Sequence, residues 1–237
     1  MITKWQSEDG NIKLINGDFN NIIDNIKDES IDLILTDIPF NISKDNNFKT
    51  MKDREGRNGI DFEDWDKNFD ESVLYKLQSK IKKGGSLVLF HSFEQFSLIM
   101  NIFDNLEFKD KIIWQKSNPM PRNRDRRYIS NVEIASWYVK KGEKWIFNRQ
   151  SEKYDGCVFL YPSESGGGFK RFHPTQKNLQ LIKDLILRHS NEGDLVADFF
   201  FGSCQVGVAC KQLNRKFIGS EIDEKYFDIA VERIKGE

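Results

Sequence analysis

Short apolar runs alternate with amphipathic stretches along most of the chain. The runs are typical of buried parallel strands and lie at residues 12–18, 31–36, 86–92, 194–198 and 216–221. The stretches between them have the helical spacing of apolar residues, at residues 19–26, 71–81, 93–106, 172–187, 205–213 and 223–233. Strands that alternate with helices predict an α/β fold with a doubly wound, mostly parallel sheet.

Four further segments modify this pattern. Residues 111–116 and 131–140 have the pattern of a strand pair, which predicts an antiparallel edge of the sheet. Residues 41–67 are polar and aperiodic, and a loop of this length in a compact domain is usually functional or mobile. Residues 142–171 are irregular as well, so no helix or strand is predicted there.

The composition fits one folded domain. A chain of 237 residues can bury one sizeable core, so residues 1–237 are predicted to form a single domain, and the 19 phenylalanines argue against disorder. The sequence has no apolar run of about 18 residues and no signal-peptide core, which predicts a soluble, cytoplasmic protein. The cysteines, Cys157, Cys204 and Cys210, have no metal-type spacing, so we expect reduced thiols and no metal.

A carboxylate, a proline and an aromatic ring follow the apolar run at 31–36. In open α/β sheets ligands bind at the carboxyl ends of strands, where Asp37, Ile38, Pro39 and Phe40 are expected. Asp37 and the Ile38 carbonyl could accept hydrogen bonds from the two N–H groups of an exocyclic amine. Pro39 would fix the backbone, and Phe40 would stack on a base. The alternative is an ordinary turn at a strand end, and these residues alone leave both possibilities open.

Arginines are concentrated in one segment of a chain whose net charge is −1. Arginine favours bidentate contacts with phosphate and guanine, so a DNA-contact surface is the better interpretation, against a solvated charged face. The segment contains Arg122, Arg124, Arg126, Arg127 and Tyr128.

The last third of the chain has the pattern of a nucleotide-binding β–turn–α unit. A strand that ends at Asp198 is followed by a turn containing Gly202 and by the predicted helix at 205–213. Glu221 ends the next strand, roughly 20 residues after the glycine turn, where an acidic side chain can bind ribose hydroxyls. The pairing of the two features favours a cofactor site over a structural turn.

Three motifs in this order resemble those of the β-group DNA amino-methyltransferases of restriction–modification systems. Residues 37–40 resemble the Asp-Pro-Pro-Tyr catalytic motif, and residues 173–177 match His-Pro-Thr-Gln-Lys residue for residue. Residues 198–204 resemble the Asp-Pro-Phe-x-Gly-Ser-Gly cofactor motif. The aspartate that opens the first motif favours adenine N6 as the methyl acceptor.

The resemblance implies S-adenosylmethionine as cofactor, double-stranded DNA as substrate, a base flipped out of the duplex and a possible homodimer. Target recognition would lie at about 117–172, and residues 41–67 could close over the base. Asp18 and Phe19 would contact the cofactor's adenine, and Thr175, Gln176 and Lys177 its methionine carboxylate. The other implied cofactor contacts are Asp37, Asp198, Phe199, Phe200, Gly202, Ser203, Cys204 and Glu221.

The cofactor motif departs from the family pattern at three positions. Phe199 replaces a proline, Cys204 the second glycine, and Gln205 a small hydroxyl residue. If position 204 needs a positive φ, a side chain there costs about 1 kcal/mol or blocks the cofactor. Two alternatives to an adenine-N6 enzyme therefore stay open, a cytosine-N4 methyltransferase and a degenerate, non-catalytic DNA-binding homologue.

Overall fold

The computed structural model describes residues 3–40, 69–119, 125, 128–164 and 171–236. Its elements, in chain order, are β1 (Thr3–Gln6), β2 (Ile12–Asn16), α1 (Phe19–Ile23), β3 (Ile31–Asp37), η2 (Glu71–Lys76), α2 (Leu77–Lys80), β4 (Ile81–His91), η3 (Phe93–Gln95), α3 (Phe96–Ile102), β5 (Leu106–Lys116), β6 (Val132–Lys140), β7 (Val158–Tyr161), α4 (Leu179–His189), β8 (Leu195–Asp198), α5 (Gln205–Gln212), β9 (Lys216–Glu221) and α6 (Glu224–Gly236).

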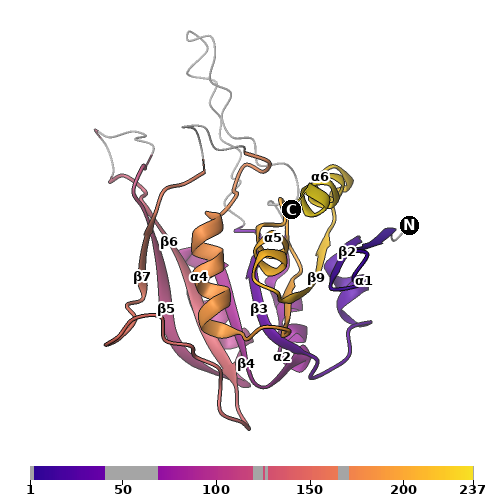
Figure 1. The fold of residues 1–237 in the computed structure, drawn as a ribbon. Helices are drawn as coiled ribbons and strands as arrows, with labels where there is room; N and C mark the ends of the chain where they lie inside the picture. Colours follow the sequence, from indigo (N-terminus) through magenta and orange to yellow (C-terminus); the bar gives the residue numbers. More distant parts are fainter. Residues whose placement is uncertain (1–2, 41–68, 120–124, 126–127, 165–170, 237) are drawn as a thin grey trace.

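Within these ranges nine strands form one mixed sheet in the order β1-β2-β9-β8-β3-β4-β6-β5-β7 (Figure 1). The central strands β2, β9, β8, β3 and β4 are parallel. Strands β6 and β5 pair antiparallel, and β1 is antiparallel to β2. The doubly wound, mostly parallel α/β prediction is therefore confirmed.

Both faces of the central strands are buried because their side chains alternate between two apolar clusters. On β4, Val88 and Phe90 point to one cluster, which α4, α5 and α6 cover. Leu87 and Leu89 point to the other, which α1, η2, α2 and α3 cover. This alternation explains why the parallel strands are continuous apolar runs in the sequence.

The predicted edge of the sheet is wrong in one respect. The pair β5 and β6 does not end the sheet, because β7 pairs with β5 in parallel register from Ile113 and Val158 onwards. Strand β7 lies inside residues 142–171, where no strand was expected. Its four residues are too few for a periodic signal, and the indole of Trp114 holds it by donating to the Tyr161 carbonyl at 2.9 Å.

Several predicted helices begin or end elsewhere. The segment 71–81 starts as the 3-10 helix η2, and β4 already begins at Ile81. The segment 93–106 ends its helix at Ile102, because the chain then turns into β5. Helix α4 begins at Leu179 rather than near residue 172, because its N-cap is Asn178, which accepts a hydrogen bond from the Leu181 amide.

Across the described ranges, none of the helices has the length and apolar character that crossing a membrane requires. The same ranges contain no group of three or more histidine, cysteine, aspartate or glutamate side chains arranged to hold a metal ion.

Candidate active site

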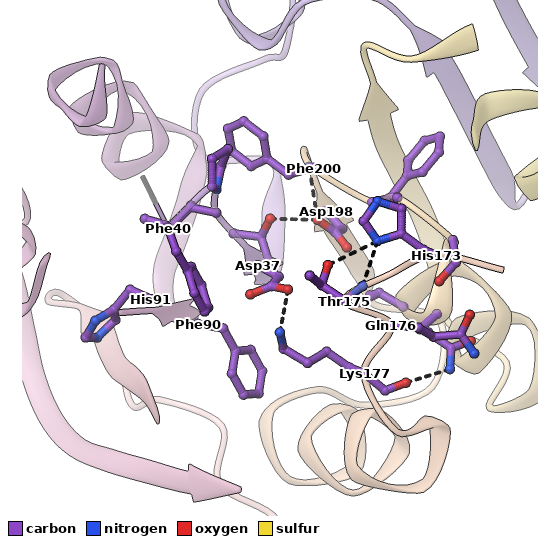
Figure 2. Close-up of a pocket in the computed structure, with 18 of the residues that line it drawn as sticks. Asp37, Phe40, Phe90, His91, His173, Thr175, Gln176, Lys177, Asp198 and Phe200 are labelled. Carbon is purple, nitrogen blue, oxygen red and sulfur yellow. Dashed lines mark hydrogen bonds and ion pairs between the residues drawn. The ribbon is translucent and has the colours of Figure 1, made fainter. Parts of the chain in front are cut away.

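A cavity of about 1190 Å³ opens at the carboxyl ends of the parallel strands. It brings together the strand ends of β3 and β8, the segment before α4 and the turn before α5 (Figure 2). The predicted catalytic and cofactor residues that line it are Asp18, Phe19, Asp37, Ile38, Pro39, Phe40, Thr175, Gln176, Lys177, Asp198, Phe199, Phe200, Gly202, Ser203 and Glu221.

Two hydrogen bonds hold the turn after β3, one from its own backbone to β4 and one from a side chain of η3. The amide of Ile38 donates to the Phe90 carbonyl at 3.3 Å, and the Ile38 side chain is buried. The carbonyl of Pro39 accepts a hydrogen bond from the buried side chain of Gln95 at 3.0 Å. Gln95 also closes a capping box with Ser92 at the start of η3, so η3 supports the catalytic turn.

A chain of alternating charges crosses the floor of the cavity. The Lys177 ammonium lies 2.5 Å from Asp37 Oδ2 and 2.9 Å from Glu133 Oε2. Lys116 lies 2.6 Å from the other oxygen of Glu133. Figure 2 shows the Lys177 side chain reaching from the segment before α4 to Asp37 at the end of β3. Two carboxylates and two ammonium groups therefore balance one another where little water can screen them.

Asp37 combines an unusual ionisation with an unfilled hydrogen-bonding position. Burial raises its pKa to about 6, while Lys177 opposes this rise and Glu133 adds to it. Its Oδ1 atom is buried and, within the described part of the chain, accepts no hydrogen bond. A buried carboxylate oxygen without a donor is costly, so this position is suited to an incoming N–H group.

The structure places Lys177 differently from the expected cofactor contact. Its ammonium is held by Asp37 and Glu133, and its backbone carbonyl accepts from Gln205 Nε2 at 2.7 Å. Although burial alone would lower the pKa of Lys177, the two carboxylates hold it above its ordinary value. Lys177 therefore stays charged and belongs structurally to the Asp37 side of the cavity. A contact with the methionine carboxylate stays a prediction.

Two carboxylates define the cofactor side of the cavity. Asp198 accepts hydrogen bonds from the Thr36 hydroxyl at 2.6 Å and the Phe200 amide at 3.1 Å, and burial raises its pKa to about 7. Glu221 accepts from the Gly202 amide at 2.8 Å and the Asp223 amide at 2.9 Å, and burial raises its pKa. Glu221 thereby shapes the glycine turn while still lining the cavity.

An aromatic cluster forms the wall beside these carboxylates. Phe19 packs edge-on against Phe199 at 5.8 Å between ring centroids and stacks on Phe200 at 5.3 Å. Phe69 packs edge-on against Phe200 and was not predicted, because it follows the segment 41–68 without a periodic signal. Asp18, predicted to contact adenine, uses its carboxylate to cap α1 through the Asn20 amide at 2.8 Å.

Cys204 lies beneath the turn rather than in the cavity. Its backbone is left-handed, with φ +60° and ψ +39°, as the glycine of the family pattern would allow. Its side chain is fully buried and is absent from the residues that line the cavity. The thiol occupies the space that a Cβ at Gly207 would need. The substitution therefore leaves the cavity open and incurs only backbone strain, on the order of 1 kcal/mol.

Replacing Gly207 by alanine is expected to destabilise the fold by about 1–3 kcal/mol, because the new methyl group collides with the Cys204 thiol. Adding Cys204→Gly should recover part of that loss, since glycine removes the thiol and accepts the positive φ. Urea unfolding of the two single variants and the double variant measures both effects. Additive losses in the double variant would contradict the packing of these two positions against each other.

Gln205, the third departure from the family pattern, joins three segments. Its Nε2 donates to the Lys177 carbonyl and, at 2.8 Å, to Glu164 Oε2, and its Oε1 accepts from Arg233 at 2.5 Å. The Arg233 side chain also donates to the Ser203 carbonyl. A small hydroxyl residue could not make these contacts, so Gln205 belongs to a set of partners that includes Glu164 and Arg233. Glu164 and Arg233 were not predicted, because the fold alone brings them next to Gln205.

The comparisons with known proteins agree with this geometry. A family model described as DNA methylase matches residues 31–232, which is most of the chain. The chain belongs to the DNA methylase family. Type II methyltransferase M.HinfI of Haemophilus influenzae is 31% identical over 94% of this chain and 68% of its own length. Type II methyltransferase M2.LlaDCHI of Lactococcus lactis subsp. cremoris is 28% identical over 99% of this chain and 93% of its own length.

Solved structures resemble this DNA methylase over nearly its whole length. The M1.HpyAVI–SAM complex has a TM-score of 0.73 and 34% identity, covering 94% of this chain and 98% of that one. The PvuII DNA methyltransferase (cytosine-N4-specific) has a TM-score of 0.73, and the match covers 96% of this chain and 86% of that one. At 20% identity the second likeness supports the fold alone.

Two regions predicted to touch DNA in the methylase lie largely outside the described residues. Arg122, Arg124, Arg126 and Arg127 are among them, as is the loop 41–67. Tyr128 is described and is 97% exposed after the arginines. Of the expected recognition interval 117–172, strands β6 and β7 belong to the central sheet.

Proposed function

We propose that this DNA methylase transfers a methyl group from S-adenosylmethionine to N6 of an adenine flipped out of double-stranded DNA. The observation that carries the proposal is Asp37, whose Oδ1 atom is buried beside the expected cofactor site and receives no hydrogen bond from the described residues. Membership of the DNA methylase family supports methyl transfer to DNA, and the aspartate at the head of the catalytic motif favours adenine.

The catalytic turn is suited to activating an aromatic amine. The lone pair of such an amine is delocalised into the ring, so the nitrogen is a poor nucleophile until its protons are held out of plane. Asp37 Oδ1 would accept a hydrogen bond from one N–H of the amine and the Ile38 carbonyl from the other, while Phe40 would stack on the base. The raised pKa of Asp37 brings the carboxyl closer to the basicity needed to take up the proton that methyl transfer releases.

The cofactor side fits an adenosine attached to an amino acid. Glu221 lines the cavity and would bind the ribose hydroxyls, and the apolar wall of Phe19, Phe199 and Phe200 would contact a purine. Thr175 and Gln176 line the same cavity, where they would meet the amino-acid end. When bound there, S-adenosylmethionine supplies an electrophilic methyl group. The protein's contribution is alignment of that methyl group with the amine.

The decisive experiment incubates the protein with labelled S-adenosylmethionine and unmethylated bacteriophage DNA, followed by mass analysis of the released nucleosides. We expect N6-methyldeoxyadenosine. N4-methyldeoxycytidine would overturn the adenine assignment and leave DNA methylation intact, whereas unlabelled DNA would overturn the proposed function. Because the substrate is cellular DNA, we also propose that the protein acts in the cytoplasm.

Glu221→Leu is expected to weaken binding of S-adenosylmethionine by about 10- to 100-fold, because each hydrogen bond from a hydroxyl to a charged group contributes about 1.5–3 kcal/mol. Isothermal titration calorimetry without DNA measures this directly. Glu224→Gln, an exposed change in the first turn of α6, is the control and should bind as the wild type does. Equal affinity in both variants would show that Glu221 does not bind the cofactor. The absence of heat with the wild type would favour the alternative of a degenerate, non-catalytic DNA-binding homologue.

A further inference from the structure

We infer that Glu133 on β6 is a positioning residue, which shares the Lys177 ammonium with Asp37 and so sets how firmly the catalytic carboxylate is held. This inference rests on the proposed function, because it gives Asp37 its catalytic meaning. No motif of the sequence contains Glu133, and its position beside Asp37 follows only from the fold.

The sheet brings Glu133 to the active site from two strands away. Asp37 on β3 pairs with Phe90 on β4, and Phe90 pairs with Ala135 on β6, two residues beyond Glu133. Residues two apart on a strand share a face, so Glu133 projects to the face and edge where Asp37 ends its own strand. The side chains of Asp37 and Glu133 are 23% and 20% exposed, and that of Lys177 is 7% exposed.

The Lys177 ammonium contacts both carboxylates, so a stronger contact with one weakens its contact with the other. Its ammonium lies 2.5 Å from Asp37 and 2.9 Å from Glu133, close to the rings of Phe40 and Phe90, at 5.4 and 5.1 Å from their centroids. Such a site holds the cation by ion pairing and by the ring faces. If Glu133 were neutral, the ammonium would be left to Asp37 alone.

Lys116 completes the arrangement from β5. It lies 2.6 Å from Glu133 and keeps that glutamate ionised together with Lys177. Burial alone would raise the pKa of Glu133, but the two ammonium groups hold it below its ordinary value. Glu133 is therefore a permanent negative charge next to Lys177, whereas Asp37 is the carboxylate with the raised pKa.

Within the described chain, the charged groups around Asp37 come from four neighbouring segments. Lys177 precedes α4, Glu133 is on β6, Lys116 is on β5 and Asp198 ends β8. Lys177 and Lys116 favour the ionised form of Asp37, whereas burial and Glu133 disfavour it. A tightly held, weakly basic Asp37 would be a poor acceptor for the amine proton, so Glu133 maintains the basicity that the reaction needs.

The first test reads the ionisation of Asp37 without DNA or cofactor. Protein labelled with carboxyl-¹³C aspartate is titrated by NMR, and the Asp37 signal is assigned by its loss in Asp37→Asn. We expect a midpoint at about 6 in the wild type. It should fall by roughly half a unit or more in Glu133→Gln, and rise by about 1–3 units in Lys177→Met.

Opposite shifts distinguish positioning from a merely structural role, which would lower stability without moving the midpoint. Asp110→Asn, an exposed change on β5, is the control and should leave the midpoint unchanged. Unchanged midpoints in both test variants, or shifts in the same direction, would overturn the inference. If Lys177→Met does not fold, Lys116→Met replaces it, since loss of Lys116 also raises the midpoint.

The second test follows the rate of methyl transfer against pH. The acid limb should move with the Asp37 midpoint, to lower pH in Glu133→Gln and to higher pH in Lys177→Met, and Asp110→Asn should keep the wild-type limb. Midpoints that move while the limb stays would separate Glu133 from catalysis and overturn the inference. A wild type that transfers no methyl group to DNA would overturn the proposed function alone, since the NMR titration stands without it.

Discussion

Asp37→Asn is expected to lower methyl transfer to DNA by at least about 10³-fold while S-adenosylmethionine still binds. The amide nitrogen of asparagine is a hydrogen-bond donor, so it cannot accept a hydrogen bond from the amine as a carboxylate oxygen does. The neutral amide also cannot take up the proton released by transfer, and general-base contributions are typically about 10²–10⁴-fold. Label transfer under single-turnover conditions, with cofactor affinity measured separately, gives both quantities.

Asp32→Asn is the matched control, because Asp32 is on the same strand but at its opposite end, where it pairs with Lys82. This variant should retain transfer within a few-fold of the wild type. If Asp37→Asn kept comparable activity, the amine would have to be activated elsewhere in the cavity. If it lost cofactor binding as well, its loss of activity would say nothing about the amine.

Glu164→Leu is expected to destabilise the protein by about 3 kcal/mol or more and to weaken cofactor binding. The carboxylate of Glu164 accepts from the Leu179 amide at 2.8 Å and from the side chains of Gln176 and Gln205. Leucine would remove the acceptor that these three donors share, and Gln205 would keep only its hydrogen bond to the Lys177 carbonyl. Each buried donor that loses its acceptor costs about 1–3 kcal/mol. For a chain of this size 3 kcal/mol corresponds to a fall in Tm of roughly 6–12 °C.

Thermal unfolding with and without S-adenosylmethionine measures the effect of Glu164→Leu on the fold and on the site. Glu192→Leu, an exposed change between α4 and β8, controls for the gain of an apolar side chain and should leave Tm nearly unchanged. Glu164→Gln should fall between the two, because its amide oxygen still accepts. A wild-type Tm in Glu164→Leu would mean that water satisfies these donors.

The parts of the fold that sequence reasoning predicted are those with a local signal. Strands β3, β8 and β9 are apolar runs bounded by polar residues, and their ends carry Asp37, Asp198 and Glu221. Since carboxyl ends of neighbouring parallel strands share one edge, these three acids could be placed in one site before any coordinates were known. That Asp37 Oδ1 receives no hydrogen bond from the described part of the chain depends on packing and could not be predicted.

Residues whose function depends on register were missed. Glu133 and Glu164 are single charges in unremarkable surroundings, and their partners, Lys177 among them, are distant in the sequence. One signal was available, because Glu133 is the only acidic residue in the mostly apolar strand β6. An acidic residue in such a strand requires a partner or a function. That Glu133 lies near Asp37 follows only from the strand order β3-β4-β6.

The Cys204 thiol and the missing side chain of Gly207 have a consequence for how such chains are recognised. A profile that scores each position separately penalises cysteine at 204 as a broken cofactor motif. The backbone there keeps the left-handed shape, and the sulfur fills volume that position 207 leaves vacant. Positions 204 and 207 therefore fill one volume together. Chains with an apparently defective glycine turn should be judged by whether position 207 is small before they are set aside as inactive.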